Sequence, residues 1–320
     1  MRVTVVICTY TLDRYGAFKE AIASVEAQTY EDVDLVLVSD GNKMVCEKMC
    51  SEYENTDHMT LHCNDQSLGI GPSRNEGAKL GTGDIVAFID DDSTATENWI
   101  EEIVWAFEEY DALSVGGKMI GDWVAGEPWF LPAEFHWLVG VTHPNFADSG
   151  EEVRNAFGSN YAFRRDVFLA LSGFDERVGR KGDKERQAHE SEIGVRLQQE
   201  YSRGVIYHPK AVVAHKIFKY RTNVFWLLRR SFMQGYSKRI FDRIHPDAAG
   251  NEGEYLRHLL FGNVPSRLQG LVRSPSVAKA VQLLMLFVFT ATVGLGYLYG
   301  AVMIGLQSYS DSIDLTFGTN

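Results

Sequence analysis

The stretch Ile85-Val86-Ala87-Phe88-Ile89-Asp90-Asp91-Asp92 decides the fold class of this chain. Its five apolar residues are typical of a strand that is covered on both faces of a parallel sheet. Ligands of open α/β sheets bind beyond the carboxyl ends of such strands, which is where the three carboxylates stand. Asp90 and Asp92 share one face in extended geometry because they are two residues apart. Two carboxylates on one face suit a hard divalent cation that also holds the phosphates of a nucleotide.

The three aspartates have a structural alternative, which is a capping turn before a helix. Ser93, Thr94 and Thr96 can cap a helix that begins near Glu97, so helix initiation does not require three consecutive carboxylates. Like charges repel unless a cation lies among them. A site for a metal and a nucleotide is therefore the favoured interpretation.

Predicted strands and helices alternate over the first 110 residues. Strands are expected at residues 3–8, 35–39 and near 61–63, and the helix after the first strand shows Phe18, Ile22 and Val25 at helical spacing. This alternation predicts a doubly wound α/β sheet. The first strand is not followed by G-x-G-x-x-G, and no G-x-x-x-x-G-K-S/T occurs, which argues against a hydride-transfer enzyme and a P-loop nucleotidase.

The charge of the chain is unevenly distributed. The 320 residues carry a formal charge of -12, which argues against general affinity for nucleic acid. Residues 216–273 nevertheless hold eleven Lys and Arg against four Asp and Glu. Within this basic segment, residues 225–233 read either as an amphipathic helix at a bilayer surface or as a helix packed on the soluble domain.

An uncharged segment follows the basic one. Residues 281–306 span 26 positions without Asp, Glu, Lys or Arg. As a helix this segment would be roughly 39 Å long, enough to cross a bilayer of about 30 Å, whereas a core helix of a soluble domain normally keeps a charged face. Lys and Arg crowd its N-terminal side, so the positive-inside rule places residues 1–276 in the cytoplasm. We expect a single-pass transmembrane helix over residues 277–306 and an extracytoplasmic tail over residues 307–320.

No signal peptide is recognised at the N-terminus, because the first apolar run is too short. The four cysteines, Cys8, Cys46, Cys50 and Cys63, show no C-x-x-C spacing. In a reducing cytoplasm they are expected to be unpaired thiols that act as small core residues.

Motifs that lie between residues 3 and 215 together resemble family 2 glycosyltransferases of the GT-A fold. The motifs are Thr9-Tyr10, Asp13-Arg14, Val38-Ser39-Asp40-Gly41, Ser73-Arg74-Asn75-Glu76-Gly77, the strand with Asp90-Asp91-Asp92, Gly158-Ser159-Asn160, Gly173-Phe174-Asp175-Glu176 and Glu190-x-Glu192-Ile193-x-x-Arg196-Leu197. The resemblance implies an α/β GT-A domain with a Rossmann-like mixed sheet over residues 1–220, followed by a basic interfacial segment over residues 221–276.

The resemblance also implies a UDP-sugar donor held with Mg²⁺ or Mn²⁺. It assigns Asp40 to the uridine, Asp90 to the ribose or the metal, and Asp92 to the metal that bridges the diphosphate. The other donor-binding residues that it implies are Thr9, Tyr10, Asp13, Arg74, Asn75 and Asp91.

Two further positions follow from the same resemblance. Relatives commonly carry Glu-Asp where this chain has His189-Glu190, so Glu190 would be the base that takes the proton of the acceptor hydroxyl. His215 follows a predicted strand over residues 211–214, where many relatives have a histidine near the metal. A lone histidine after a strand is also compatible with a purely structural role.

A narrower resemblance concerns the acceptor. The segment Gly179-Arg180-Lys181-Gly182-Asp183 and the C-terminal apolar segment are similar to those of haloarchaeal glycosyltransferases that extend dolichyl-phosphate-linked glucose in protein N-glycosylation. This implies transfer of glucuronic acid from UDP-glucuronate to a polyisoprenoid-phosphate-linked sugar at the membrane. Arg180 or Lys181 would meet the donor carboxylate, and Arg229, Arg230 and Arg239 would meet the acceptor phosphate.

Other functions remain open at the level of sequence. They are transfer from another UDP-sugar in cell-surface polysaccharide or glycolipid synthesis, and a non-catalytic, membrane-tethered protein that binds nucleotide sugars. A sugar nucleotidyltransferase would show a glycine-rich basic loop after the first strand, which residues 9–14 are not. A processive synthase would bring several membrane spans.

Overall fold

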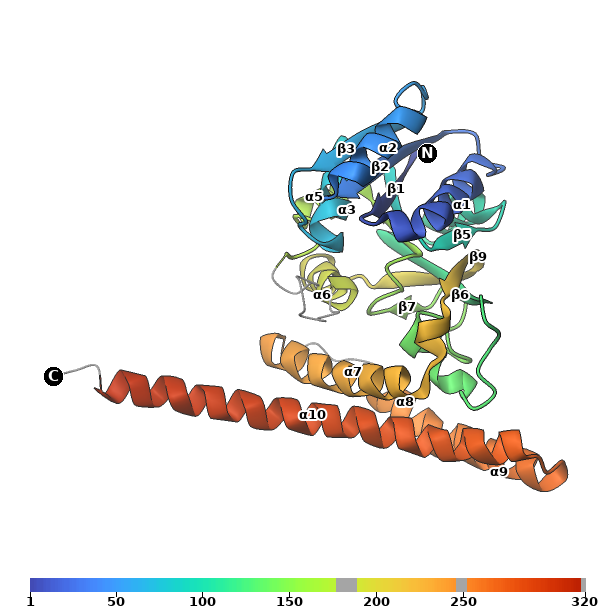
Figure 1. Ribbon diagram of the computed structural model, residues 1–320, viewed down its shortest axis with the longest axis vertical. Coiled ribbons are helices and arrows are strands. Elements are labelled where there is room, and N and C mark those ends of the chain that lie inside the picture. Colours follow the sequence, from blue (N-terminus) through green and yellow to red (C-terminus); the bar gives the residue numbers. More distant parts are fainter. Residues whose placement is uncertain (177–188, 246–251, 318–320) are drawn as a thin grey trace. The chain divides into compact units, whose positions relative to one another are not determined.

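The computed structural model describes residues 1–176, 189–245 and 252–317 (Figure 1). They fall into two compact units. Unit 1 comprises Met1–Val124 and Gly140–Ile217, and unit 2 comprises Ala125–Val139 and Phe218–Asn320. The chain passes finally into unit 2 at Phe218. The aromatic segment around residues 125–139 interrupts unit 1 and packs in unit 2.

Unit 1 is built on one mixed sheet. Its strands are β1 (Val3–Thr9), β2 (Val33–Asp40), β3 (Met59–Asn64), β4 (Ile85–Asp90), β5 (Ser93–Ala95), β6 (Ser114–Trp123), β7 (Glu152–Val153), β8 (Tyr161–Arg164) and β9 (Val205–Ile217). The order is β3-β2-β1-β4-β8-β6-β9-β5, with β7 paired to β9. Strands β3, β2, β1 and β4 run parallel, and β8 is antiparallel to both β4 and β6. The predicted Rossmann-like mixed sheet is confirmed.

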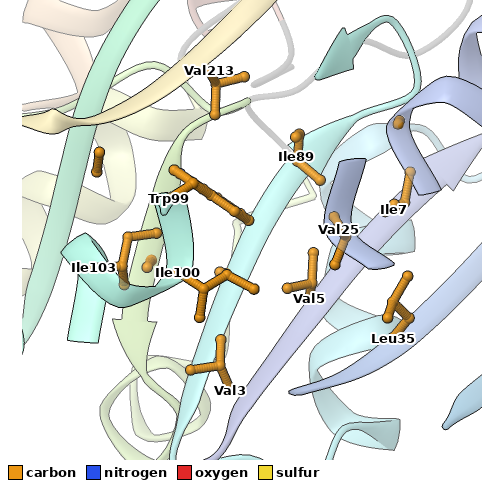
Figure 2. Packing of buried hydrophobic residues seen from close by; sticks show 14 of the residues in the cluster. Val3, Val5, Ile7, Val25, Leu35, Ile89, Trp99, Ile100, Ile103 and Val213 are labelled. Atoms are coloured by element: carbon orange, nitrogen blue, oxygen red, sulfur yellow. The ribbon is translucent and has the colours of Figure 1, made fainter. Parts of the chain in front are cut away.

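Helices cover both faces of this sheet. They are η1 (Leu12–Arg14), α1 (Tyr15–Glu26), α2 (Lys43–Tyr53), α3 (Ile70–Leu80), α4 (Trp99–Glu109), α5 (Arg165–Ala170) and α6 (His189–Tyr201). Because side chains alternate along β1, Val3, Val5 and Ile7 face one core, which α1 and α4 complete (Figure 2). Val6 faces the second core together with Phe88, on the side of the sheet covered by α3, α5 and α6.

The parallel part of the sheet places the functional residues. β1, β2 and β4 start and end together, with Val3 opposite both Val33 and Ile85. Their carboxyl ends, at Thr9, Asp40 and Asp90, therefore meet at one edge of the sheet. The alternative of a capping turn is not observed, because Ser93–Ala95 forms β5, which pairs with β9.

Unit 2 is helical. Its elements are η2 (Ala133–Val139), η3 (Lys219–Thr222), α7 (Val224–Ile244), α8 (Glu252–His258), η4 (Leu259–Asn263), α9 (Val264–Arg273) and α10 (Val277–Phe317). Phe135 of η2 packs against Phe289 of α10, and Arg267 of α9 forms an ion pair with Glu134. Residues Val277–Ile304 of α10 are long and apolar enough to cross a membrane.

The cysteines differ from the prediction. Cys46 of α2 and Cys63 of β3 form a disulfide, and Cys50 stays a free thiol. All three are only half-buried, so the expectation of four unpaired core thiols holds for Cys8 alone. Sequence spacing could not reveal this pair because packing of α2 against β3 brings the two sulfur atoms together.

Candidate active site

A buried hydrogen bond fixes the first carboxylate after β4. Thr9, the last residue of β1, donates its hydroxyl hydrogen to Asp91 Oδ2 at 2.8 Å. Arg14 of η1 approaches from the other side, with Nη2 3.3 Å from Asp91 Oδ1 and Nη1 3.0 Å from Asp92 Oδ2. The loop after β1 thus supplies one cation that faces two neighbouring aspartates.

The burial of Asp91 disfavours its charged form. Desolvation raises the pKa of Asp91 to about 7, against the opposing effect of Arg14. Burial alone would lower the pKa of Arg14, but Asp91 and Asp92 outweigh it and raise that pKa. The cluster is therefore short of positive charge around neutral pH.

Asp92 also meets His215. Asp92 Oδ1 lies 3.4 Å from His215 Nε2, and pairing of Ser93 with His215 in the β5–β9 ladder produces this contact. A Cβ atom on Gly140, which has a φ of +81°, would lie 2.9 Å from His215 Nδ1. The backbone at Gly140 therefore leaves room for the imidazole ring, which the sequence had linked to the metal.

Arg74 contacts the two remaining carboxylates, which belong to Asp90 and Glu190. This α3 residue is buried, with Nη2 2.5 Å from Asp90 Oδ1 and Nη1 3.6 Å from Glu190 Oε1. Burial would lower the pKa of Arg74, but Asp90 and Glu190 raise it, so the guanidinium is a fixed positive charge. Asp90 and Glu190 are 100 positions apart in sequence and are held around one planar cation.

The loop before β8 adapts to this arrangement. A Cβ atom on Gly158 would collide with Glu190 Oε1 and lie 2.7 Å from Arg74 Nη1. The next residue, Ser159, accepts a hydrogen bond from the Asp90 backbone N–H at 3.1 Å and donates to Ser93 Oγ at 2.8 Å. Gly158-Ser159 thus leaves space for the Glu190 carboxylate and fixes the backbone at Asp90.

Asp40 is tied into the loop before α3. Its carboxylate accepts hydrogen bonds from the N–H groups of Leu68 and Gly69, at 2.8 Å and 3.0 Å, and from the side chains of Asn64 and Ser67, each at 3.0 Å. Burial opposes ionisation, but these four hydrogen bonds prevail and lower the pKa of Asp40. In the structure Asp40 shapes the loop, and the uridine contact stays a prediction.

Three other predicted residues have distinct surroundings. Asn75 donates to the backbone oxygen of Phe174 and accepts from its N–H, both at 2.8 Å, so its amide holds the turn after α5. Tyr10 is exposed, and the Arg14 guanidinium lies 4.9 Å from its ring centre. Asp13 is exposed on η1.

The side chains available as metal ligands fit a hard divalent ion in part. Asp92 and His215 lie together, and the carboxylate is a ligand that Mg²⁺ and Mn²⁺ prefer, whereas the imidazole is a ligand type more typical of softer transition metals. Asp90, the third predicted ligand, instead contacts Arg74. The structure therefore brings two of the three predicted metal ligands into direct contact.

Some site residues were not singled out from the sequence. The motifs that contain Arg14, Gly158 and Ser159 assign these residues no role of their own. Their contacts to Asp91, Glu190 and Asp90 give them positioning roles. A cation after the first strand was the one available signal for Arg14. The predicted donor contacts of Arg180 and Lys181 lie outside the described residues.

Known protein families and relatives match this sequence. Residues 4–171 match the model of the family described as glycosyl transferase family 2. The chain belongs to this family. The glycosyltransferase is 50% identical over 301 residues to the glucosyl-dolichyl phosphate glucuronosyltransferase of Haloferax volcanii, covering 94% of this chain and 96% of that protein.

Solved structures agree on the fold. The mannosyltransferase PcManGT of Pyrobaculum calidifontis, in complex with GDP-Man and Mn²⁺, superposes with a TM-score of 0.56 at 18% identity, covering 95% of this chain and 87% of that one. TarS of S. aureus in complex with UDP-GlcNAc also gives 0.56, at 16% identity, covering 92% and 82%. The glycosyltransferase thus has the predicted GT-A fold, and its action as a hexosyltransferase agrees with the relatives.

Proposed function

We propose that this glycosyltransferase moves glucuronic acid from UDP-glucuronate to a dolichyl-phosphate-linked glucose, with inversion at the transferred carbon. The identity of 50% to a glucuronosyltransferase with that acceptor, over nearly the full length of both chains, supports the choice of substrates. The observation that carries the chemistry is the Glu190 carboxylate, which lies beside the Arg74 and Asp90 pair at the carboxyl edge of the sheet.

In this proposal Glu190 takes the proton of the acceptor hydroxyl as that oxygen attacks the sugar. A positioned general base contributes roughly 10²- to 10⁴-fold to such a step. Arg74 orients the carboxylate, and Gly158 leaves the space that it occupies. A single displacement inverts the sugar carbon, because acceptor and leaving group lie on opposite faces of the ring, as in inverting hydrolases.

The diphosphate leaving group needs positive charge. Asp92 and His215, with Asp90 as a further candidate, would hold Mg²⁺ or Mn²⁺, which when bound neutralises the charge that develops on the diphosphate. Arg14 would remain close by because it already contacts Asp91 and Asp92. Thr9, Tyr10, Asp13, Asp40 and Asn75 are proposed to line the donor site directly or through the loops that they hold.

The acceptor implies attachment to a membrane, with unit 1 on the cytoplasmic side. The structure has one candidate membrane helix among the described residues, in α10. A single crossing by residues 277–306 stays a prediction from the sequence.

A donor panel tests the proposed function. Membranes that contain the full chain are incubated with radiolabelled UDP-sugars and short lipid-phosphate glycosides, with and without Mn²⁺. We expect label from UDP-glucuronate in the glucosylated lipid, only with the metal. Label from a different UDP-sugar would support the alternative transferase. Metal-dependent UDP binding without transfer of any sugar would support the non-catalytic alternative.

A further inference from the structure

The outward side of α10 is apolar from Val277 to Ile304. Its exposed large side chains are Val277, Leu284, Phe287, Leu295, Leu298, Tyr299 and Val302. At 100° per residue these positions form one stripe, and the buried Leu286, Phe289 and Gly296 lie on the opposite side. A helix that packs one side on protein and exposes the other to water would carry charges in this stripe.

The inward side of α10 packs directly on α7 (Figure 1). A Cβ atom on Gly235 of α7 would collide with the backbone oxygen of Val293, and one on Gly296 of α10 with that of Phe232. Phe232 and Tyr236 also pack on Tyr299, with ring centres 5.5 Å and 6.0 Å apart. Backbone contact of this kind makes α7 and α10 one structural element.

Helix α7 brings charges to the middle of the apolar segment. Tyr297 of α10 donates a hydrogen bond to Asp242 at 3.2 Å, and Lys238 pairs with Asp242 at 2.7 Å. The guanidinium of Arg239 lies 5.7 Å from the Tyr297 ring centre. If α10 crossed a bilayer in this packing, these charged groups would enter the hydrocarbon layer beside Tyr297, where charged side chains are costly.

We infer that α10 lies in the plane of the membrane and does not cross it. The stripe from Leu284 to Val302 enters the acyl layer, and α7 stays on the water side. This inference rests on the membrane attachment proposed above, and it does not depend on the identity of the transferred sugar. An in-plane helix with one apolar and one protein-covered side matches interfacial membrane helices.

The neighbouring elements continue the same surface chemistry. Leu268 and Val272 of α9, one helical turn apart, are exposed, as is Phe261 of η4. Arg257 of α8 and Arg273 of α9 are also exposed, and their charges complement anionic lipid headgroups. The predicted occupant of the stripe is therefore an anionic bilayer surface.

Protease access to the C-terminus distinguishes the two arrangements. The full chain, with an epitope tag after Asn320, is inserted into sealed vesicles that expose unit 1 to the medium. We expect protease to remove the tag without detergent, because both ends of an in-plane α10 lie on the side of unit 1. A tag that is protected until detergent is added would overturn the inference in favour of a single crossing.

A flotation assay tests the stripe itself. Leu295→Gln with Leu298→Gln should reduce flotation with phosphatidylglycerol–phosphatidylcholine vesicles at least tenfold. Met44→Gln with Leu80→Gln, which exchanges exposed apolar residues of unit 1, should not change the flotation.

Equal flotation of both variants would exclude the stripe as the lipid contact, and recovery of the unaltered chain in the soluble fraction would overturn the attachment itself. UDP binding by each variant shows that unit 1 is folded, and glycosyl transfer in detergent tests the proposed function separately.

Discussion

Arg74 Nη1 lies 3.6 Å from Glu190 Oε1, while the other end of the same guanidinium contacts Asp90. The residue that the family resemblance assigns to proton transfer is therefore held by a buried cation on α3. Planarity matters here, because a guanidinium directs N–H groups on two different nitrogens at the two carboxylates in a fixed plane.

Removing the ionisable group of Glu190 should stop the chemistry and spare donor binding. Glu190→Gln keeps the size of the side chain, so turnover should fall by roughly 10²- to 10⁴-fold. Calorimetry with UDP and Mn²⁺ should give an unchanged affinity. Near-normal turnover would remove Glu190 from its role.

Replacing Arg74 should slow proton transfer by Glu190, because Arg74 orients the Glu190 carboxylate. Arg74→Lys keeps the charge but replaces two fixed guanidinium nitrogens by a single ammonium nitrogen, so Glu190 loses its orientation and kcat should drop about tenfold or more while the chain stays folded. Arg164→Lys is the matched control, since Arg164 pairs with the exposed Asp111. Equal kcat values for the two variants would show that the orientation of the guanidinium is unimportant.

A methyl group at Gly158 should displace the Glu190 carboxylate. Gly158→Ala places a Cβ atom against Glu190 Oε1, so turnover should fall at least tenfold. Gly16→Ala is the control, because a Cβ atom at this helical position meets nothing within 4 Å and alanine favours helix. The comparison is made by steady-state kinetics and thermal melts. Full activity of Gly158→Ala would mean that the observed Glu190 position is not the productive one.

Asp92 should be needed for metal-dependent donor binding. Asp92→Asn removes the charge beside His215, so the affinity for UDP in the presence of Mn²⁺ should fall roughly tenfold to a hundredfold. Titration calorimetry with and without EDTA measures this, with Asp111→Asn as the control. Unchanged metal-dependent binding would shift the metal site away from Asp92.

Asp91 should make the metal-free protein less stable as the pH rises. Its folded pKa is about 7 against an ordinary 3.8, so the folded state binds the extra proton between these values. Stability then falls from about pH 4 to pH 7, by up to about 4 kcal/mol. Urea unfolding in EDTA should show this slope in the unaltered protein and a smaller slope in Asp91→Asn. Identical pH profiles would contradict the buried, raised pKa.

The sequence by itself determined the sheet and its functional edge. Apolar runs that end in Asp40 and Asp90 predicted parallel strands with carboxylates at their carboxyl ends, because strand period and burial are local properties of the chain. The motifs around Arg74 and Glu190 predicted the family, because their order and spacing along the chain can be read from the sequence.

Only the tertiary structure decided which of these groups meet. The contacts of Arg74 with Glu190, of Asp92 with His215 and of Cys46 with Cys63 join segments that are 17 to 123 positions apart, so no local pattern records them. The same holds for α10. Its composition alone predicts a membrane helix, but whether it crosses the bilayer depends on the charged helix packed against it, which hydropathy cannot show.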